Sequence, residues 1–241
     1  MNELSIVVPC VTTTESLPKF LDDLASFLMA NPSDTDCIVV TNDAPDVCAA
    51  VMQYVEERYP WLQFTVLRRV GDARGYGALA RFGIAHSTSR YVALVSPYGE
   101  DDLSVLPKLL AVIRGGAQVV QVTRFANPED ARVLPMKFRF YQAVYRALVR
   151  VLLGHHVTDS TYGYKCFDRA FMQALGLTQN GYSICPEITL KGLLVGGKVA
   201  YVPSRPQVNR ANQDFSLLRE GPGYVWLLLR GAGHRAGISW F

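Results

Sequence analysis

Three consecutive acids, Glu100, Asp101 and Asp102, are the residues of this chain best suited to chemistry. They follow a five-residue apolar run, 91–95, which indicates a fully buried strand because polar and apolar residues do not alternate in it. The turn 96–99 ends that strand. Since ligands of an open α/β sheet bind at the carboxyl ends of its strands, acids placed here suit a metal ion or phosphate-linked chemistry. The alternative is a solvated helix N-terminus, where acids favour the helix dipole.

The elements that would position these acids alternate between strands and helices. Short apolar runs occupy 4–8, 37–40, 64–67, 91–95 and 118–122, and apolar residues at helical spacing follow the first four. This order predicts an α/β fold with a mostly parallel sheet and helices on both of its faces. We expect a single domain over 1–206 and a C-terminal extension, 207–241, that packs on the domain, on a partner or on a membrane surface.

The second half of the chain contains a long helical pattern, 138–153, which Gly154 ends. Arg139, Arg146 and Arg150 are seven and four residues apart and therefore share one face of this helix. Such a stripe is either solvated or able to meet a phosphate or an anionic bilayer surface.

Four more segments complete the second half. The polar and aromatic stretch 159–167 indicates a loop, a helix is predicted from Cys185 to about Leu194, and 199–202 is predicted to be a last strand. A basic, polar segment follows at 205–219. The apolar run 224–229 is too short to cross a membrane, but it is long enough to lie on one or to pack on a partner.

Composition limits the class of protein. The 241 residues are 49% hydrophobic, enough for a sizeable core, and the net charge of +3 is too small to indicate nucleic-acid binding. The five cysteines are scattered without a CxxC pair, which argues against a disulfide framework and a zinc site. The first strand begins too early to leave room for a signal peptide, and no run reaches the roughly 20 apolar residues of a membrane span. We therefore expect a cytoplasmic protein, with peripheral membrane contact as an open alternative.

Seven blocks, in order, carry a family resemblance. They are LSIVVPC, IVVTNDAPD, ARGYGALARFGIAHSTSRYVAL, VTRF, DSTYGYKCF, GYSICPEITL and VAYVPSRPQ, and the match covers about Leu4 to Pro206. With these blocks the chain resembles the inverting, GT-A-fold glycosyltransferases of family 2, especially the dolichol-phosphate mannose synthase-like branch. The resemblance implies a GT-A-like, Rossmann-like fold and an enzyme that transfers a sugar from a nucleoside-diphosphate sugar.

The donor site follows from the same resemblance. The residues expected to border the nucleoside diphosphate and its sugar are Pro9, Val11, Asn42, Arg74, Ser96, Pro97 and Tyr98. Tyr98 is either a stacking group or a surface aromatic in a turn. We favour UDP because Asn42 offers both a hydrogen-bond donor and an acceptor to an imide edge.

The sequence departs from the family at the metal site. Two aspartates that hold a divalent ion on the diphosphate in the family correspond here to positions in Ser96–Pro97–Tyr98. Glu100 and Asp101 are therefore expected to bind Mg²⁺ or Mn²⁺ in their place, if a metal is used. The alternative is neutralisation of the diphosphate without metal, by Arg68, Arg69, Arg74 and Arg124.

Two acceptors remain open. A polyprenyl phosphate, the acceptor in the resembled branch, is already anionic and needs no base, and its phosphate would bind Arg124, Arg139 and Arg210. A small hydroxyl acceptor, such as a sugar or a natural-product intermediate, would need a catalytic base, for which Asp159 and Glu187 are the expected residues. Both acids also have a structural interpretation, Asp159 as a turn cap and Glu187 as a first-turn residue of a helix.

A non-catalytic subunit that binds a nucleotide sugar or a lipid phosphate is the alternative function, because the two aspartates are missing. A doubly wound oxidoreductase is disfavoured, since ARGYG does not provide the GxGxxG spacing after the first strand.

Overall fold

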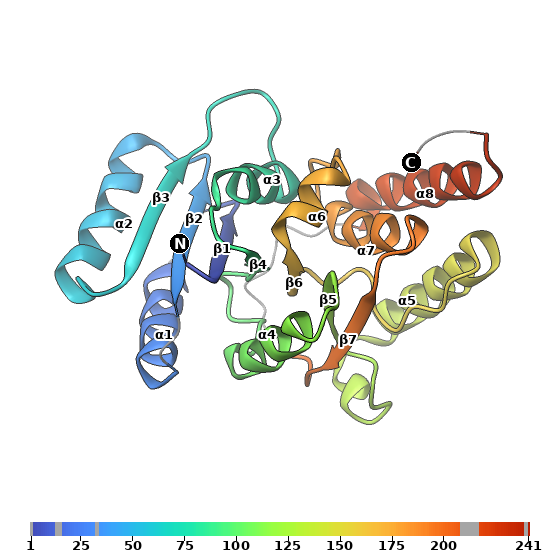
Figure 1. The fold of residues 1–241 in the computed structure, drawn as a ribbon, viewed down its shortest axis with the longest axis horizontal. Coiled ribbons are helices and arrows are strands. Elements are labelled where there is room, and N and C mark those ends of the chain that lie inside the picture. The colour runs from blue at the N-terminus through green and yellow to red at the C-terminus, as the bar shows by residue number, and fades with distance from the viewer. Residues whose placement is uncertain (1, 13–15, 32–33, 208–216, 239–240) are drawn as a thin grey trace.

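A seven-stranded sheet organises the chain (Figure 1). The structure is a computed structural model that describes residues 2–12, 16–31, 34–207, 217–238 and 241. The strands are β1 (Leu4–Cys10), β2 (Thr35–Thr41), β3 (Gln63–Arg68), β4 (Tyr91–Leu94), β5 (Val119–Thr123), β6 (Lys165–Asp168) and β7 (Val199–Pro203). Their order in the sheet is β3-β2-β1-β4-β6-β5-β7.

The sheet is mostly parallel, as predicted. β1 pairs in parallel with β2 and β4, β2 with β3, and β5 with β7, whereas β6 runs antiparallel between β4 and β5. Because β4 and β5 both oppose β6, they point the same way. The carboxyl ends of β1, β2, β4 and β5 therefore meet at one edge of the sheet.

Helices cover both faces of this sheet (Figure 1). The helices α1 (Ser16–Ala30), α2 (Pro45–Arg58) and α4 (Leu106–Arg114) contribute to the core on one face. The helices α3 (Tyr76–His86), α6 (Arg169–Ala174) and α7 (Ile184–Leu194) contribute to the core on the other. β1 is buried along its whole length, which explains why its sequence shows no alternation. The α/β fold with helices on both faces is confirmed.

A third core joins the C-terminal half. It contains α5 (Met136–Leu148), the π-helix η3 (Val149–Leu153) and α8 (Leu217–Arg235), packed with α7. These helices form one end of the molecule, beside β7 (Figure 1). Gly154 ends η3 in the left-handed conformation, with φ of 76°, as its position in the sequence predicts. Two short 3₁₀ helices, η1 (Leu103–Val105) and η2 (Asp130–Val133), precede α4 and α5.

One prediction of secondary structure was wrong. The expected loop 159–167 includes the start of β6, and the buried Lys165 in that strand hides it from an apolar pattern. The segment 224–229 lies inside α8, whose sequence contains Gly221, Pro222 and Gly223, residues that normally interrupt helices. In the described part of the chain, no helix combines the length and the apolar character that a membrane crossing requires.

Candidate active site

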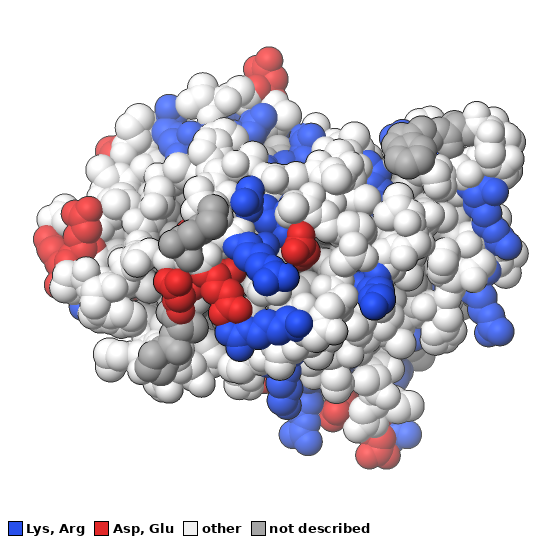
Figure 2. All heavy atoms as spheres, in the orientation of Figure 1, with Lys and Arg blue, Asp and Glu red and all other residues white. Residues whose placement is uncertain are grey.

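A cavity of about 330 Å³ lies at the carboxyl ends of β4 and β5. The turn after β4 contributes Ser96, Glu100 and Asp101, and the residue after β5 contributes Arg124. The approach to β6 and three helices complete the lining with Thr161, Tyr162, Gly163, Tyr76, Phe138, Gln142 and Tyr224, among others. Figure 2 shows acidic and basic side chains gathered around the middle of one face of the molecule. The structure thus brings together four of the residues expected at the site, Ser96, Glu100, Asp101 and Arg124.

The three consecutive acids have different environments. Asp102 caps η1, because its Oδ1 accepts the Ser104 N–H at 3.0 Å. Asp101 Oδ2 accepts the Ser96 N–H at 2.7 Å, while its Oδ1 is buried without a hydrogen-bond partner among the described residues. Burial, and then the charge of Glu100, raise the pKa of Asp101 to about 7. Asp101 therefore carries an unsatisfied oxygen in a largely desolvated carboxyl group, which a solvated helix N-terminus would not show.

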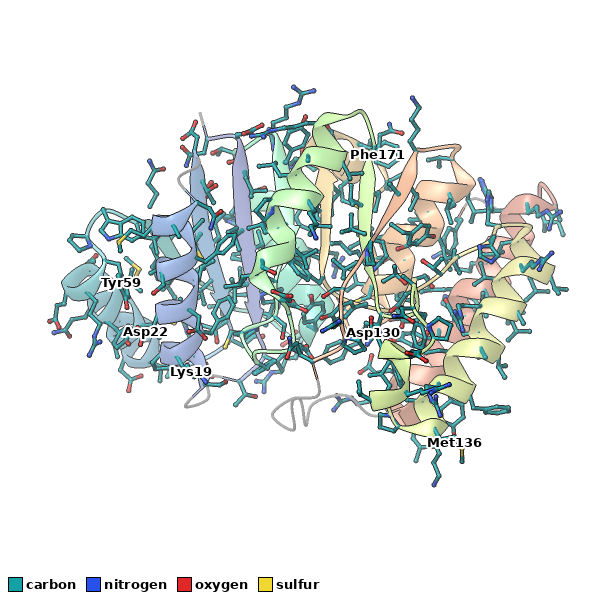
Figure 3. All side chains as sticks on the ribbon, turned by 90° about the horizontal axis from the view of Figure 1, so that it is seen from below. Lys19, Asp22, Tyr59, Asp130, Met136 and Phe171 are labelled. Carbon is teal, nitrogen blue, oxygen red and sulfur yellow. The ribbon has the colours of Figure 1, made fainter. Side chains whose placement is uncertain are left out.

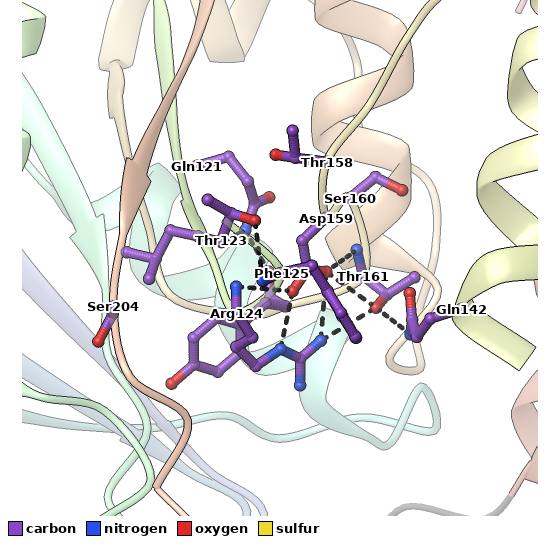
Figure 4. A network of polar contacts seen from close by, with 12 residues as sticks. Gln121, Thr123, Arg124, Phe125, Gln142, Thr158, Asp159, Ser160, Thr161 and Ser204 are labelled. Atoms are coloured by element: carbon purple, nitrogen blue, oxygen red, sulfur yellow. Dashed lines mark hydrogen bonds and ion pairs between the residues drawn. The ribbon is translucent and has the colours of Figure 1, made fainter. Parts of the chain in front are cut away.

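Arg124 and Asp159 form a buried ion pair (Figure 4). Arg124 donates from Nε to Asp159 Oδ2 at 2.7 Å and from Nη2 to Oδ1 at 3.2 Å. Thr161 joins the pair: its Oγ1 accepts from Arg124 Nη2 at 3.2 Å and lies 3.3 Å from Asp159 Oδ1, to which it donates. Gln142 Nε2 donates to the same Oγ1 at 2.6 Å. The network ties α5, β5 and the segment before β6 together at the cavity wall.

Aromatic rings surround these polar groups. The Arg124 guanidinium lies over the Tyr162 ring at 4.3 Å and over the Phe138 ring at 5.0 Å. Tyr76 stacks on Tyr182 with 4.9 Å between ring centroids. Gly163 is required where it stands, because a Cβ there would lie 2.9 Å from the Tyr76 hydroxyl oxygen.

The other residues expected at the donor site lie nearby in different environments. Pro97 and Tyr98 line a neighbouring cavity of about 440 Å³, which Asp101 also lines. Tyr98 is only 2% exposed and its hydroxyl oxygen is 3.4 Å from the Thr12 nitrogen, so it is not a surface aromatic.

The remaining donor-site residues are not part of the walls of these two cavities. Pro9 is buried in β1 and Val11 is half-buried. Asn42 donates through Nδ2 to the Arg69 carbonyl at 2.8 Å. This hydrogen bond uses the amide donor that was expected to meet a nucleobase. Arg74 is exposed in the segment before α3.

The two expected catalytic acids are both fully buried. Asp159 lies behind Arg124 and Thr161 at the cavity wall, as described above. Glu187, in α7, accepts the Thr178 and Gln179 N–H groups at 2.9 Å and pairs with Lys191 at 3.0 Å. The Glu187 oxygens are thus bound by α7 and by the segment before it, and Glu187 is not among the residues of the cavity wall.

The arginines expected at an acceptor phosphate are also separated. Arg139, on α5, is half-buried and its Nε is buried without a hydrogen-bond partner among the described residues. Arg124 lines the cavity, but it is already bound to Asp159. Arg210 lies outside the described residues.

Comparison with known proteins identifies the family. The family described as Glycosyl transferase family 2 matches residues 5–176, which is more than half of the chain. The chain belongs to this family. It is a family 2 glycosyltransferase with the GT-A fold that the sequence blocks predict.

Individual relatives of this glycosyltransferase match only part of the chain. Uncharacterised glycosyltransferases of Mycobacterium bovis and Mycobacterium tuberculosis are 30% identical over 124 residues, covering 49% of this chain and 47% of theirs. The match therefore spans about half the length of these curated relatives.

Solved structures agree on the fold. Glucosyl-3-phosphoglycerate synthase from Mycobacterium tuberculosis, in complex with phosphoglyceric acid, has a TM-score of 0.69 at 17% identity, with 99% of this chain and 81% of that chain covered. The same enzyme with Mn²⁺, UDP-glucose and phosphoglyceric acid has a TM-score of 0.65 at 16% identity, with 99% and 81% covered.

The acids of this glycosyltransferase fit a divalent cation that also binds phosphate oxygens. Mg²⁺ is usually held by one or two carboxylates, with phosphate oxygens and waters as further ligands. Asp101, with its unsatisfied Oδ1, and the adjacent Glu100 would provide the two carboxylates of such a site. Within the described residues, no group of three or more His, Cys, Asp or Glu side chains is placed to hold an ion by itself.

Sequence reasoning missed several residues that build the site. Thr161, Tyr162 and Gln142 line the cavity, and Lys165 lies behind it with its Nζ donating to the Thr189 hydroxyl at 2.9 Å. Burial lowers the pKa of Lys165 to about 7. A glycine between two tyrosines, at Gly163, was the available signal for this segment. A lone Gln in an Arg-rich helix gave no such signal.

Proposed function

We propose that this family 2 glycosyltransferase is an inverting enzyme that moves a sugar from a nucleoside-diphosphate sugar, with UDP as the favoured nucleotide. The observation that carries the proposal is the meeting of Asp101 and Arg124 in one cavity at the carboxyl ends of β4 and β5. Structural neighbours supply support for the donor, since glucosyl-3-phosphoglycerate synthase was crystallised with UDP-glucose and Mn²⁺.

The reaction makes one bond and breaks one. The acceptor oxygen attacks the anomeric carbon while the bond from that carbon to the diphosphate oxygen breaks, which inverts the anomeric configuration. Negative charge develops on the leaving diphosphate, so positive groups placed there lower the barrier. A divalent cation held by Glu100 and Asp101 would neutralise that charge. Arg68, Arg69 and Arg74 are the alternative, from the end of β3 and the segment after it.

A hydroxyl acceptor also loses a proton. Thr161 lines the cavity and its hydroxyl donates to Asp159 at 3.3 Å. Thr161 Oγ1 already accepts from Gln142 Nε2 at 2.6 Å and from Arg124 Nη2 at 3.2 Å, so the acceptor hydroxyl would replace the longer of these two hydrogen bonds. Its proton would then pass to Thr161 Oγ1 while the Thr161 proton passes to Asp159. This route uses Asp159 as the final proton acceptor without direct contact between Asp159 and the substrate. A polyprenyl phosphate acceptor would need no such transfer.

A non-catalytic nucleotide-sugar or lipid-phosphate binding subunit is the second candidate. Ser96, Pro97 and Tyr98 offer no carboxylate at the positions where the resembled enzymes hold metal. Tyr98 is buried and close to the Thr12 backbone, so it is part of the protein interior.

We also infer peripheral contact with an anionic membrane at the end formed by α5, η3 and α8. These elements contain a single acid, Glu220, and seven basic residues: Lys137, Arg139, Arg146, Arg150, Arg219, Arg230 and Arg235. Met136 and Trp226 are 75% and 56% exposed there, and Met136 points away from the sheet (Figure 3). Basic and apolar residues on one surface favour anionic bilayers. Co-sedimentation with phosphatidylglycerol vesicles but not with phosphatidylcholine vesicles is expected, and equal sedimentation with both or with neither would contradict this inference.

Transfer of radiolabelled sugar tests the proposal and the choice of acceptor. UDP-glucose and GDP-mannose are offered with a polyprenyl phosphate and, separately, with soluble sugars. Asp159→Asn is expected to abolish transfer to a hydroxyl, whereas Glu187→Gln, outside the cavity, should retain transfer wherever the variant is folded. Transfer to the lipid phosphate that tolerates both substitutions would exclude the proton route. Binding of donor without any transfer would favour the second candidate.

A further inference from the structure

An apolar groove of about 440 Å³ leads away from the candidate active site between α5 and α8. It shares five lining residues with the catalytic cavity: Pro135, Phe138, Gln142, Thr161 and Tyr224. Beyond these, Val144 and Leu148 of α5 face Val225 and Leu228 of α8 across it. The groove and the cavity are therefore two ends of one continuous binding surface.

The walls of the groove leave apolar surface exposed. Val144, Leu148 and Val225 are 42%, 40% and 55% exposed, although each belongs to a helix whose other face is packed in the core. A ligand that covers such surface gains roughly 25 cal/mol per Å². An apolar pocket with a few convergent polar groups is the usual form of a small-molecule site.

Continuity with the cavity decides what the groove holds. A protein partner or a bilayer would cover the outer faces of α5 and α8, but it would not reach Thr161 and Arg124. A substrate with an apolar part would fill the groove and place its polar end in the cavity. The occupant that fits is therefore part of the acceptor.

Charge and hydrogen bonding indicate an uncharged polar end. Arg124 is compensated by Asp159, and Glu100 and Asp101 add no positive charge to the cavity. The basic residue on the groove wall, Lys137, is exposed to solvent. Apart from a divalent cation, whose charge the donor diphosphate would offset, a phosphate would thus find little net positive charge here.

Gln142 supplies a hydrogen-bond acceptor for an uncharged hydroxyl group of the ligand. It is 5% exposed and lines both spaces, and its Oε1 has no partner among the described residues. The Thr161 proton goes to Asp159, so Gln142 must present Nε2 to Thr161 and keep Oε1 for a donor. A ligand hydroxyl provides such a donor, and an ionised phosphate does not.

We propose that the acceptor is an amphiphilic alcohol whose apolar part lies in the groove between α5 and α8 and whose hydroxyl group reaches Thr161 and Gln142. This inference rests on the proposed transferase function and narrows its acceptor. It differs from the small anionic acceptor in the structures of glucosyl-3-phosphoglycerate synthase.

Binding of alkyl glucosides in the absence of donor tests the groove separately from catalysis. Dissociation constants for butyl and octyl β-glucoside, below micelle-forming concentrations, are measured by isothermal titration. Each methylene that enters the groove should tighten binding about four-fold, so octyl glucoside should bind at least ten-fold more tightly than butyl glucoside. Octyl phosphate should bind more weakly than octyl glucoside. Equal affinity for the two glucosides would overturn the proposal, and tighter binding of octyl phosphate would overturn its uncharged polar end.

Matched variants locate the binding. Val144→Gln and Val225→Gln change partly exposed groove residues and should weaken octyl glucoside binding about ten-fold each, with unfolding midpoints unchanged. Val151→Gln alters a 74% exposed valine that is not part of the groove wall and should bind as the unaltered chain does. An equal loss in Val151→Gln would show general adsorption on the apolar end instead of groove binding. If the protein binds octyl glucoside but does not transfer sugar from the donor, the proposed function is wrong and the groove proposal stands.

Discussion

Arg124 and Asp159 bind each other through two parallel hydrogen bonds, at 2.7 and 3.2 Å, in the wall of the candidate active site. The Asp159 side chain is fully buried and the Arg124 side chain is 15% exposed. The pair joins the end of β5 to the segment before β6, and it fixes Thr161 beside the cavity. Its geometry makes Asp159 a residue that acts through its neighbours.

Removing one partner should therefore destabilise the protein strongly. Asp159→Asn leaves the Arg124 charge without its carboxylate, and such a loss typically costs about 3–5 kcal/mol of the free energy of unfolding. Urea unfolding of Asp159→Asn, Arg124→Gln and the double variant measures the coupling. The double variant should lose less than the sum of the single losses. The matched surface control is Arg132→Gln, since Arg132 and Glu129 are exposed and 3.9 Å apart, and it should leave stability unchanged. Additive losses at Arg124 and Asp159 would contradict the coupling.

The buried amine of Lys165 should make stability depend on pH. Its pKa is lowered from 10.5 to about 7 by burial, so above pH 7 the folded protein loses a proton that the unfolded chain keeps. Unfolding then takes up a proton, and the free energy of unfolding rises with pH. Between pH 7 and 8.5 the rise should be about 1.5 kcal/mol. The raised pKa of Asp101, about 7, acts in the opposite direction, mainly below pH 7 and with a small remainder up to about pH 8.

Chemical unfolding at several pH values checks this dependence. Lys165→Met removes the titrating amine, so the stability of this variant should not rise over the same range. A rise of equal size in the variant would assign the effect to another group.

Metal binding should depend on the two acids of the cavity. If Glu100 and Asp101 hold a divalent cation together with the donor diphosphate, Glu100→Gln and Asp101→Asn should each weaken Mn²⁺ binding in the presence of UDP at least ten-fold. Electron paramagnetic resonance of free Mn²⁺ measures this without turnover. Asp102→Asn is the matched control, because Asp102 caps η1 and should not affect the ion. If Mn²⁺ still binds with the same affinity after both substitutions, its ligands lie elsewhere. If a chelator does not change UDP binding, the diphosphate is neutralised by arginines and not by a metal ion.

The sequence was most informative where local pattern and burial agree. The apolar runs became β1, β2, β4 and β5 because strands buried on both faces need no alternation. The run 64–67 became β3, an edge strand whose residues are half-buried or exposed. Lys165 obscured β6, because a lysine in a short run normally indicates an exposed position. Its buried amine is instead bound by the Ser160 carbonyl and the Thr189 hydroxyl, and these contacts form only in the folded chain. The acids at 100–102 could be placed at a strand end, but their separation into a helix cap and two cavity groups depends on the Ser96 N–H and on tertiary burial. Gln142 and Thr161 meet only through folding, because 19 residues separate them.

The anomeric proton of UDP-glucose, followed by nuclear magnetic resonance with an alkyl glucoside as acceptor, tests the transferase proposal most directly. The α-anomeric signal of the donor should disappear, UDP should appear in equal amount, and the new glycosidic bond should have the β configuration. A donor signal that broadens on binding but keeps its intensity would contradict catalysis, and a product with the α configuration would contradict inversion.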